Sequence, residues 1–267
     1  METKTLSSED LDKAASRKLL PPVLGRGLAL LALFVTGFLK DRKGHLLIFL
    51  GLLPVAIVIA AGIVPSAFYL ARTLYLDIIR IVYGTLLVPL FGLLLGTAAV
   101  SEEIESHTIV QIVSRPVRRV EIVIWRYIAT VVASSIAAFI ATGAMYVWFG
   151  IVAGLEIGYL VGSWSFLTVS SSIYCGIFML LGIALKRPLF WGVFVVLYEQ
   201  LLGAVFSFIG GLPYSLSAHM SNMGNFFLAF NYVIPSWTPA SSTIVLLAIL
   251  VVSLLLAVLL FHRKDLS

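Results

Sequence analysis

The chain has 267 residues, of which 60% are hydrophobic and only 12% are charged, and its mean hydropathy is +1.06. Soluble domains contain about 45–50% apolar and ~25% charged residues, so an aqueous fold is excluded and the surrounding medium is expected to be lipid. The single cysteine, Cys175, excludes an intrachain disulfide and a cysteine metal cluster. The net charge of +5 does not indicate nucleic-acid binding, because the basic residues are scattered beside predicted membrane ends.

The first 44 residues are predicted to form a cytoplasmic amino-terminal segment. Within it, residues 27–39 are apolar and are bounded by Arg26 and Lys40. Thirteen residues are too few to cross a bilayer, which needs ~20. We therefore expect an interfacial helix that lies along the cytoplasmic face of the membrane. An amino-terminal extension of the first membrane span is the alternative.

Long apolar segments predict an all-α, polytopic membrane protein. A transmembrane domain at residues 45–262 would contain six spans, at about 45–64, 81–100, 127–151, 160–185, 189–209 and 243–261. Segments of this length favour helices over barrel strands, which alternate over ~10 residues. Residues 263–267 would form a short cytoplasmic tail.

The distribution of Lys and Arg predicts the orientation of the chain. With the amino terminus in the cytoplasm, 16 of the 18 basic residues fall on the cytoplasmic side, and only Arg72 and Arg80 fall outside. Cytoplasmic loops carry an excess of basic residues. We expect a plasma-membrane protein with six spans and with both termini in the cytoplasm.

Two outer segments differ from ordinary loops. Residues 65–80 mix aromatic and charged side chains and are predicted to form an outer interfacial segment. Residues 210–242 contain no Asp, Glu, Lys or Arg, although an exposed aqueous loop would normally carry charge. We expect the second segment to be re-entrant, dipping into the outer leaflet or capping the bundle, where its backbone must be buried by protein or water.

One acidic side chain is predicted to lie deep in the membrane. Glu199 follows Leu189 by ten residues, which is about 15 Å along a helix and near the bilayer midplane. A charge there costs roughly 2.5–3.5 kcal/mol, so Glu199 should face the bundle or a cavity, with Gln200 beside it. These two residues are candidates for a translocation path or a subunit seam. Alternatively, Glu199 is a carboxyl group that hydrogen-bonds to a neighbouring helix.

The most informative stretch is the charged connection between the second and third spans, residues 101–126. Ile104, Thr108 and Ile112 recur at helical spacing, which predicts a short amphipathic helix. Glu102, Glu103 and Glu105 would load its amino-terminal end, where the helix dipole favours acids. A break at Pro116 follows. Orientation alone requires only basic residues, so the acids indicate a soluble partner.

This stretch resembles the permease subunits of ABC transporters of the type-2, exporter-like class. Those subunits often carry an acid-x-acid-x-Gly-Thr element followed by a Ser-x-Pro-x-x-Arg element. The matching residues here are Glu103, Glu105 and Thr108, then Ser114, Pro116 and Arg119. His107 stands where the family usually has Gly. The resemblance implies an ATPase-coupling element that includes Glu102, Glu103, Glu105, Thr108, Arg115, Pro116 and Arg119.

The resemblance also implies a function. The chain would be the permease subunit of an ATP-driven exporter, paired with a separate nucleotide-binding ATPase subunit and with a second permease subunit in a homo- or heterodimer. The sequence has no GxxxxGK[ST] motif, so we expect no ATP hydrolysis by this chain, no catalytic residues, no metal and no cofactor. Its remaining partner would be membrane lipid.

Two other functions stay open at this point. The chain could be a membrane anchor or regulator that recruits an ATPase without carrying cargo. It could also be an intramembrane protease, to which the pair Glu102-Glu103 invites comparison. The histidines His45, His107, His219 and His262 all fall at predicted span ends or in loops, so no metal cluster can be drawn from them.

Overall fold

The computed structural model describes residues 31–32, 34–38, 42–60, 68–105, 119–209, 215–230, 234 and 237–263. Within these ranges the chain is all-helical except for turns and one isolated bridge between Ile234 and Trp237. The labelled helices are α3 (Arg42–Ala60), α4 (Phe68–Asp77), η1 (Ile78–Leu87), α5 (Val88–Glu105), α7 (Arg119–Ala153), α8 (Ile157–Ala184), α9 (Pro188–Ile209), α10 (Leu216–Met223), η3 (Gly224–Phe226) and α11 (Pro239–Arg263).

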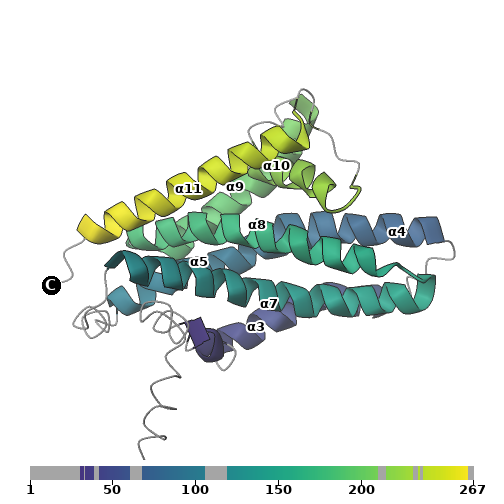
Figure 1. Cartoon of the computed structure of the whole chain (residues 1–267), viewed down its shortest axis with the longest axis horizontal. Helices are drawn as coiled ribbons and strands as arrows, with labels where there is room; N and C mark the ends of the chain where they lie inside the picture. Colours follow the sequence, from purple (N-terminus) through teal and green to yellow (C-terminus); the bar gives the residue numbers. More distant parts are fainter. Residues whose placement is uncertain are drawn as a thin grey trace, which may run out of the picture.

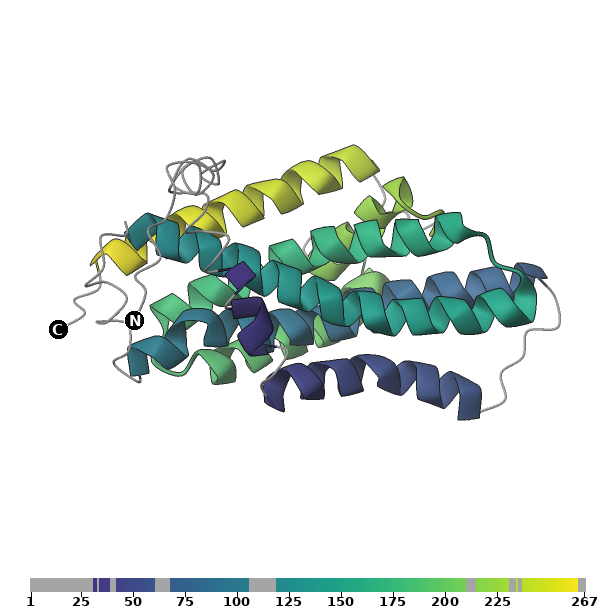
Figure 2. The same ribbon diagram turned by 60° about the horizontal axis from the view of Figure 1, so that its bottom comes forward.

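The helices form a bundle around α8, with α3 and α11 on opposite sides (Figures 1 and 2). α8 packs against α5, α7, α9 and α11, and its contact with α5 is the most extensive in the molecule. The carboxyl ends of α5, α8 and α11 lie at the same end of the bundle as the amino ends of α7 and α9 (Figure 1). The start of α4 and the α7–α8 connection lie at the opposite end.

Four helical segments in the described ranges are long and apolar enough to cross a membrane: Leu70–Ala98, Val120–Ala153, Ile157–Ala184 and Pro239–Arg263. They coincide with the second, third, fourth and sixth predicted spans. The first and fifth predicted spans coincide with shorter apolar helices, Gly44–Ala60 and Pro188–Leu201. The chain is therefore a multi-pass helical membrane protein, and the count of six spans stays a prediction.

In the segment 65–80, which was predicted to be outer and interfacial, the chain is helical from Phe68 onwards, and its interfacial position stays a prediction. α4, η1 and α5 follow one another without a break. Tyr75, Ile79 and Tyr83 are buried, and the Tyr75 hydroxyl lies 2.9 Å from the Ser163 hydroxyl of α8. Burial of this face against the bundle stabilises the helix.

The middle segment, η1, is a π-helix over Ile78–Leu87, and the N–H of Val88 donates to the carbonyl of Tyr83, five residues earlier. Pi-helical segments are rare and are frequently found at functional sites. Pro89 follows directly. It has no N–H and cannot supply an α-helical hydrogen bond to Thr85, four residues earlier.

Close approach between α5 and α8 depends on two glycines. A Cβ at Gly92 would lie 2.9 Å from the Cβ of Tyr174, and one at Gly96 would lie 2.9 Å from the Cβ of Phe178. Small residues at such spacing let membrane helices pack closely. Gly92 and Gly96 therefore fix the central helix pair of the bundle.

The connections between α7, α8 and α9 are short because each has a suitable turn residue. Gly154 adopts a positive φ of 65° and its N–H bonds to the Gly150 carbonyl at 2.9 Å. Glycine adopts this conformation without steric cost and commonly ends helices. At the other end of α8, Pro188 begins α9, a position where its missing N–H is harmless.

In the segment predicted as an amino-terminal interfacial helix, the described residues 31–32 and 34–38 are helical, and the interfacial position stays a prediction. The guanidinium carbon of Arg126 in α7 lies 4.8 Å from the centre of the Phe34 ring. This cation–π geometry connects the segment to α7. The third predicted span began at residue 127, whereas α7 begins eight residues earlier, at Arg119.

One predicted helix boundary is also wrong. The acids Glu102, Glu103 and Glu105 were expected in the first turn of a separate coupling helix, but α5 continues through Glu105. The acids therefore lie at the carboxyl end of α5. The apolar run that precedes them continues the helix past its predicted end at residue 100. Residues 106–118 lie outside the described residues.

Candidate functional site

The candidate path or seam residues, Glu199 and Gln200, lie in the described part of α9 and contact two different elements. The Glu199 carboxylate accepts hydrogen bonds from the N–H groups of Leu216 and Ser217, each at 3.1 Å, and from the Ser215 hydroxyl, also at 3.1 Å. All three donors belong to the start of α10. Glu199 therefore binds the amino end of this helix, where unpaired N–H groups and the helix dipole favour an anion.

Ser215 completes the amino end of α10. Its hydroxyl oxygen accepts from the N–H of Ala218 at 3.4 Å, so Ser215 is the N-cap residue. The same hydroxyl donates to Glu199. Two side chains, one from α9 and one from the cap itself, thus satisfy the first backbone donors of α10.

These contacts place α10 beside the middle of α9. Glu199 precedes the last residue of α9, Ile209, by ten positions, which is about 15 Å along a helix. The start of α10 therefore lies beside a point about 15 Å back from the end of α9. The residues of α10 from Ala218 to Met223 are all buried. Glu199 therefore makes hydrogen bonds to a neighbouring helix, and its place beside a translocation path or seam stays a prediction, as does the re-entrant character of residues 210–242.

Gln200 contacts the π-helix instead. Its side-chain amide donates to the backbone carbonyl of Thr85 in η1. In an α-helix that carbonyl would accept from residue 89, which is proline and has no N–H. In lipid, neighbouring side chains must satisfy backbone groups that a proline leaves free. Gln200 performs this task for Thr85.

A second polar cluster joins α10 to the start of α11. The Nδ1 atom of His219 lies 3.0 Å from the Ser242 hydroxyl. The Asn222 amide donates to the same hydroxyl at 2.8 Å and to the Trp237 carbonyl at 3.2 Å. The rings of His219 and Trp237 also meet edge to face, with centroids 4.8 Å apart. All of these groups belong to residues 210–242, the segment without acidic or basic side chains that was predicted to be re-entrant.

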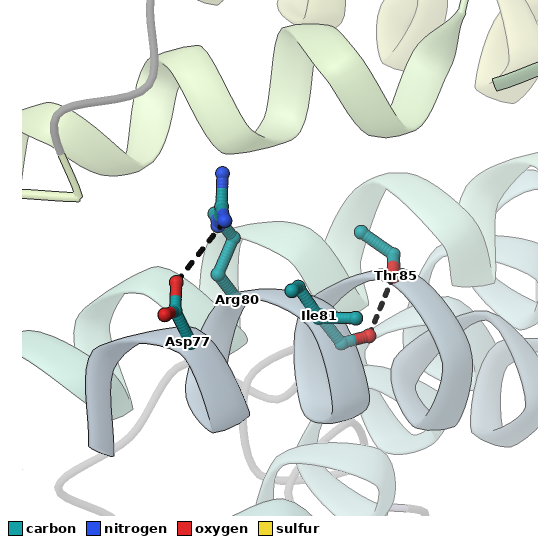
Figure 3. A network of polar contacts seen from close by, with 4 residues as sticks. All are labelled: Asp77, Arg80, Ile81 and Thr85. Atoms are coloured by element: carbon teal, nitrogen blue, oxygen red, sulfur yellow. Dashed lines mark hydrogen bonds and ion pairs between the residues drawn. The ribbon is translucent and has the colours of Figure 1, made fainter. Parts of the chain in front are cut away.

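Charged groups are also present at the start of η1, as Figure 3 shows. The Arg80 guanidinium contacts the Asp77 carboxylate at 3.1 Å, one turn earlier, and the Thr85 hydroxyl bonds back to the Ile81 carbonyl at 2.5 Å. The Asp77–Arg80 pair is partly exposed, with 48% and 20% of the two side chains accessible, so it contributes little stability.

The predicted ATPase-coupling residues are only partly described. Glu102, Glu103 and Glu105 lie in the last turn of α5 and Arg119 is the first residue of α7, at the same end of the bundle (Figure 1). Thr108, Arg115 and Pro116 lie outside the described residues. In the described part of the chain, no group of three or more His, Cys, Asp or Glu residues could hold a metal ion.

Sequence reasoning missed the partners of Glu199 and the His219–Ser242–Asn222 cluster. One local signal was available, because Ser215 follows Pro213 and precedes a short run free of Pro and Gly. Such a serine is a common helix N-cap, and it would have indicated α10. No local pattern indicates that this cap returns to Glu199.

The apolar helices define a multi-pass membrane protein. The family model described as ABC-2 family transporter protein matches residues 28–266. The chain therefore belongs to the ABC-2 transporter family and is a membrane permease. No curated protein matches it.

Proposed function

We propose that this permease is the membrane subunit of an ATP-driven exporter. A separate ATPase subunit would hydrolyse ATP, and a dimer of six-span subunits would move substrate outward across the cell membrane. ATP binding would close the two ATPase subunits, and the 101–119 element would pass that motion to the spans. Family membership supports the permease role.

The observation that carries the proposal is the gathering of the coupling residues at one end of the bundle. The acids at the end of α5 and Arg119 at the start of α7 flank residues 106–118. Acids at the carboxyl end of a helix are disfavoured by the helix dipole. A basic surface on a soluble partner would offset this cost, which supports an ATPase docking site here.

The charge distribution supports a cytoplasmic location for this end. Lys186 and Arg187 lie between α8 and α9, and Arg263 ends α11, all at the end that carries Arg119 (Figure 1). Because basic residues are enriched on the cytoplasmic side, both termini are proposed to be cytoplasmic.

The outward face of α9 supports a subunit seam. Phe190, Trp191, Phe194, Leu197 and Leu201 are all exposed on this helix. Glu199 and Gln200 are partly buried beside them. A second copy packed on α9 would cover the apolar face and bring two sets of Glu199 and Gln200 near one path. We therefore retain both residues as the proposed path or seam.

The decisive experiment is reconstitution. The chain should co-purify with a P-loop ATPase, and the complex in liposomes should hydrolyse ATP, whereas the homogeneous chain should show no turnover. Vanadate-sensitive ATP hydrolysis by the chain alone would refute the proposal that a separate subunit is the ATPase. If the chain is a transporter, cross-linking α9 between two copies should stop transport. If the chain is only a membrane anchor, the cross-linked complex should still stimulate the ATPase.

A further inference from the structure

α10 is attached very differently to the helices around it. It packs extensively against α11, and much less against η1 and α9. The difference is unexpected, because α9 precedes α10 in the chain. It indicates that the contact of α10 with α9 and η1 is weaker than its contact with α11.

The α11 side combines packing with several polar contacts. His219 and Asn222 both reach the hydroxyl of Ser242, which is fully buried. Asn222 also holds the Trp237 carbonyl just before α11. Buried hydrogen bonds of this kind are costly to break one at a time. α10 and the first turns of α11 therefore form one tightly connected unit.

On the α9 side, the described hydrogen bonds involve one side chain of α9. Among the described residues, the hydrogen bonds seen between α9 and the start of α10 all end on the Glu199 carboxylate. The next residue, Gln200, points to a different element, the carbonyl of Thr85 in η1. α9 is thus tied to η1 by Gln200 and to the α10–α11 unit by Glu199.

We propose that the outer half of the permease opens by separation of α9 from the α10–α11 unit, and that the Glu199 carboxylate is the latch that must release. α10 stays with α11 during this movement, and α9 stays with η1. This proposal rests on the proposed transport function. It assigns Glu199 a role in holding the path closed, in addition to its place beside that path.

The test is hydrogen exchange of the peptide that covers residues 216–223, measured in the reconstituted complex without nucleotide. In Glu199→Gln the side chain keeps one acceptor oxygen, and its amide N–H groups oppose the N–H groups of Leu216 or Ser217. We expect about tenfold faster exchange at the start of α10 in this variant. Glu156→Gln, which alters an exposed acid in the α7–α8 connection, is the matched control and should match wild type.

Two results would overturn the latch. The first is unchanged exchange of 216–223 in Glu199→Gln. The second is an equal rise at the first turns of α11, around Ser242, which would mean that α10 and α11 do not move together. Trapping wild type with ATP and vanadate should also raise exchange at 216–223. A third combination of results separates the two proposals. If exchange of 216–223 is faster in Glu199→Gln but does not respond to ATP and vanadate in wild type, the latch is supported and the ATP-driven function is not.

Discussion

The side-chain amide of Gln200 in α9 donates to the backbone carbonyl of Thr85, the acceptor that Pro89 leaves without an α-helical donor. Gln200, which lies far from Thr85 in the chain, therefore satisfies a backbone acceptor within the π-helix. A proline in a membrane helix frees a carbonyl, and a polar side chain on the next helix satisfies it. The relationship explains why a glutamine is tolerated in an apolar helix.

Gln200→Leu should destabilise the protein by about 1–3 kcal/mol, because the Thr85 carbonyl then loses a partner where water is scarce. Pro89→Ala restores an N–H at the α-helical position. In that background Gln200→Leu should cost clearly less, with a coupling of roughly 0.5–3 kcal/mol. Thermal unfolding in detergent of wild type, the two single variants and the double variant gives this coupling energy. Equal costs in both backgrounds would show that Gln200 and Pro89 are independent.

Gly92→Ala should destabilise the bundle by about 1–3 kcal/mol through overpacking. The added Cβ would lie 2.9 Å from the Cβ of Tyr174 and 3.2 Å from its carbonyl carbon, so the helices must move apart. Gly143→Ala is the matched control, because nothing lies within 4 Å of its added Cβ. The control should be neutral or stabilising by up to ~1 kcal/mol. Similar losses for both variants, in the same unfolding assay, would contradict close packing at Gly92.

Glu156→Cys should be labelled by a membrane-impermeant maleimide from outside the cell, and Arg187→Cys only after the membrane is opened. Both positions are exposed and lie in short connections at opposite ends of α8. The native Cys175 is fully buried and should stay unlabelled. Reversed labelling of the two positions would invert the proposed orientation.

Arg119→Glu should weaken ATPase docking or uncouple hydrolysis from transport, without unfolding the spans. Glu103→Lys should act in the same way. Both residues flank the proposed coupling element, and charge pairs that are desolvated at an interface cost about 2–5 kcal/mol when one partner is lost.

The measurement is ATPase activity and transport in the reconstituted complex, with Lys13→Glu in the amino-terminal segment as the control. That control should do little, since surface pairs contribute about 0–1 kcal/mol. If Arg119→Glu and Glu103→Lys both transport normally, at a normal yield of the complex, the 101–126 connection serves only to orient the chain in the membrane.

The sequence by itself determined the class of protein and the approximate positions of its helices. Apolar runs of ~20 residues specify helices in lipid because every backbone hydrogen bond is then made locally. The excess of basic residues on one side is also readable from sequence, and so is the short motif from Glu103 to Arg119 that pointed to the family. These features depend on residues close together in the sequence, so they can be predicted without the tertiary structure.

Only the tertiary structure decided how the polar residues are used. Local patterns could indicate that Glu199 needs a partner, but not that the N–H groups at the start of α10 supply it. The continuation of α4 through a π-helix and the pairing of Gln200 with Thr85 depend on contacts across the bundle. Such contacts join residues far apart in sequence, and their energies, rather than local propensity, fix the positions of these groups.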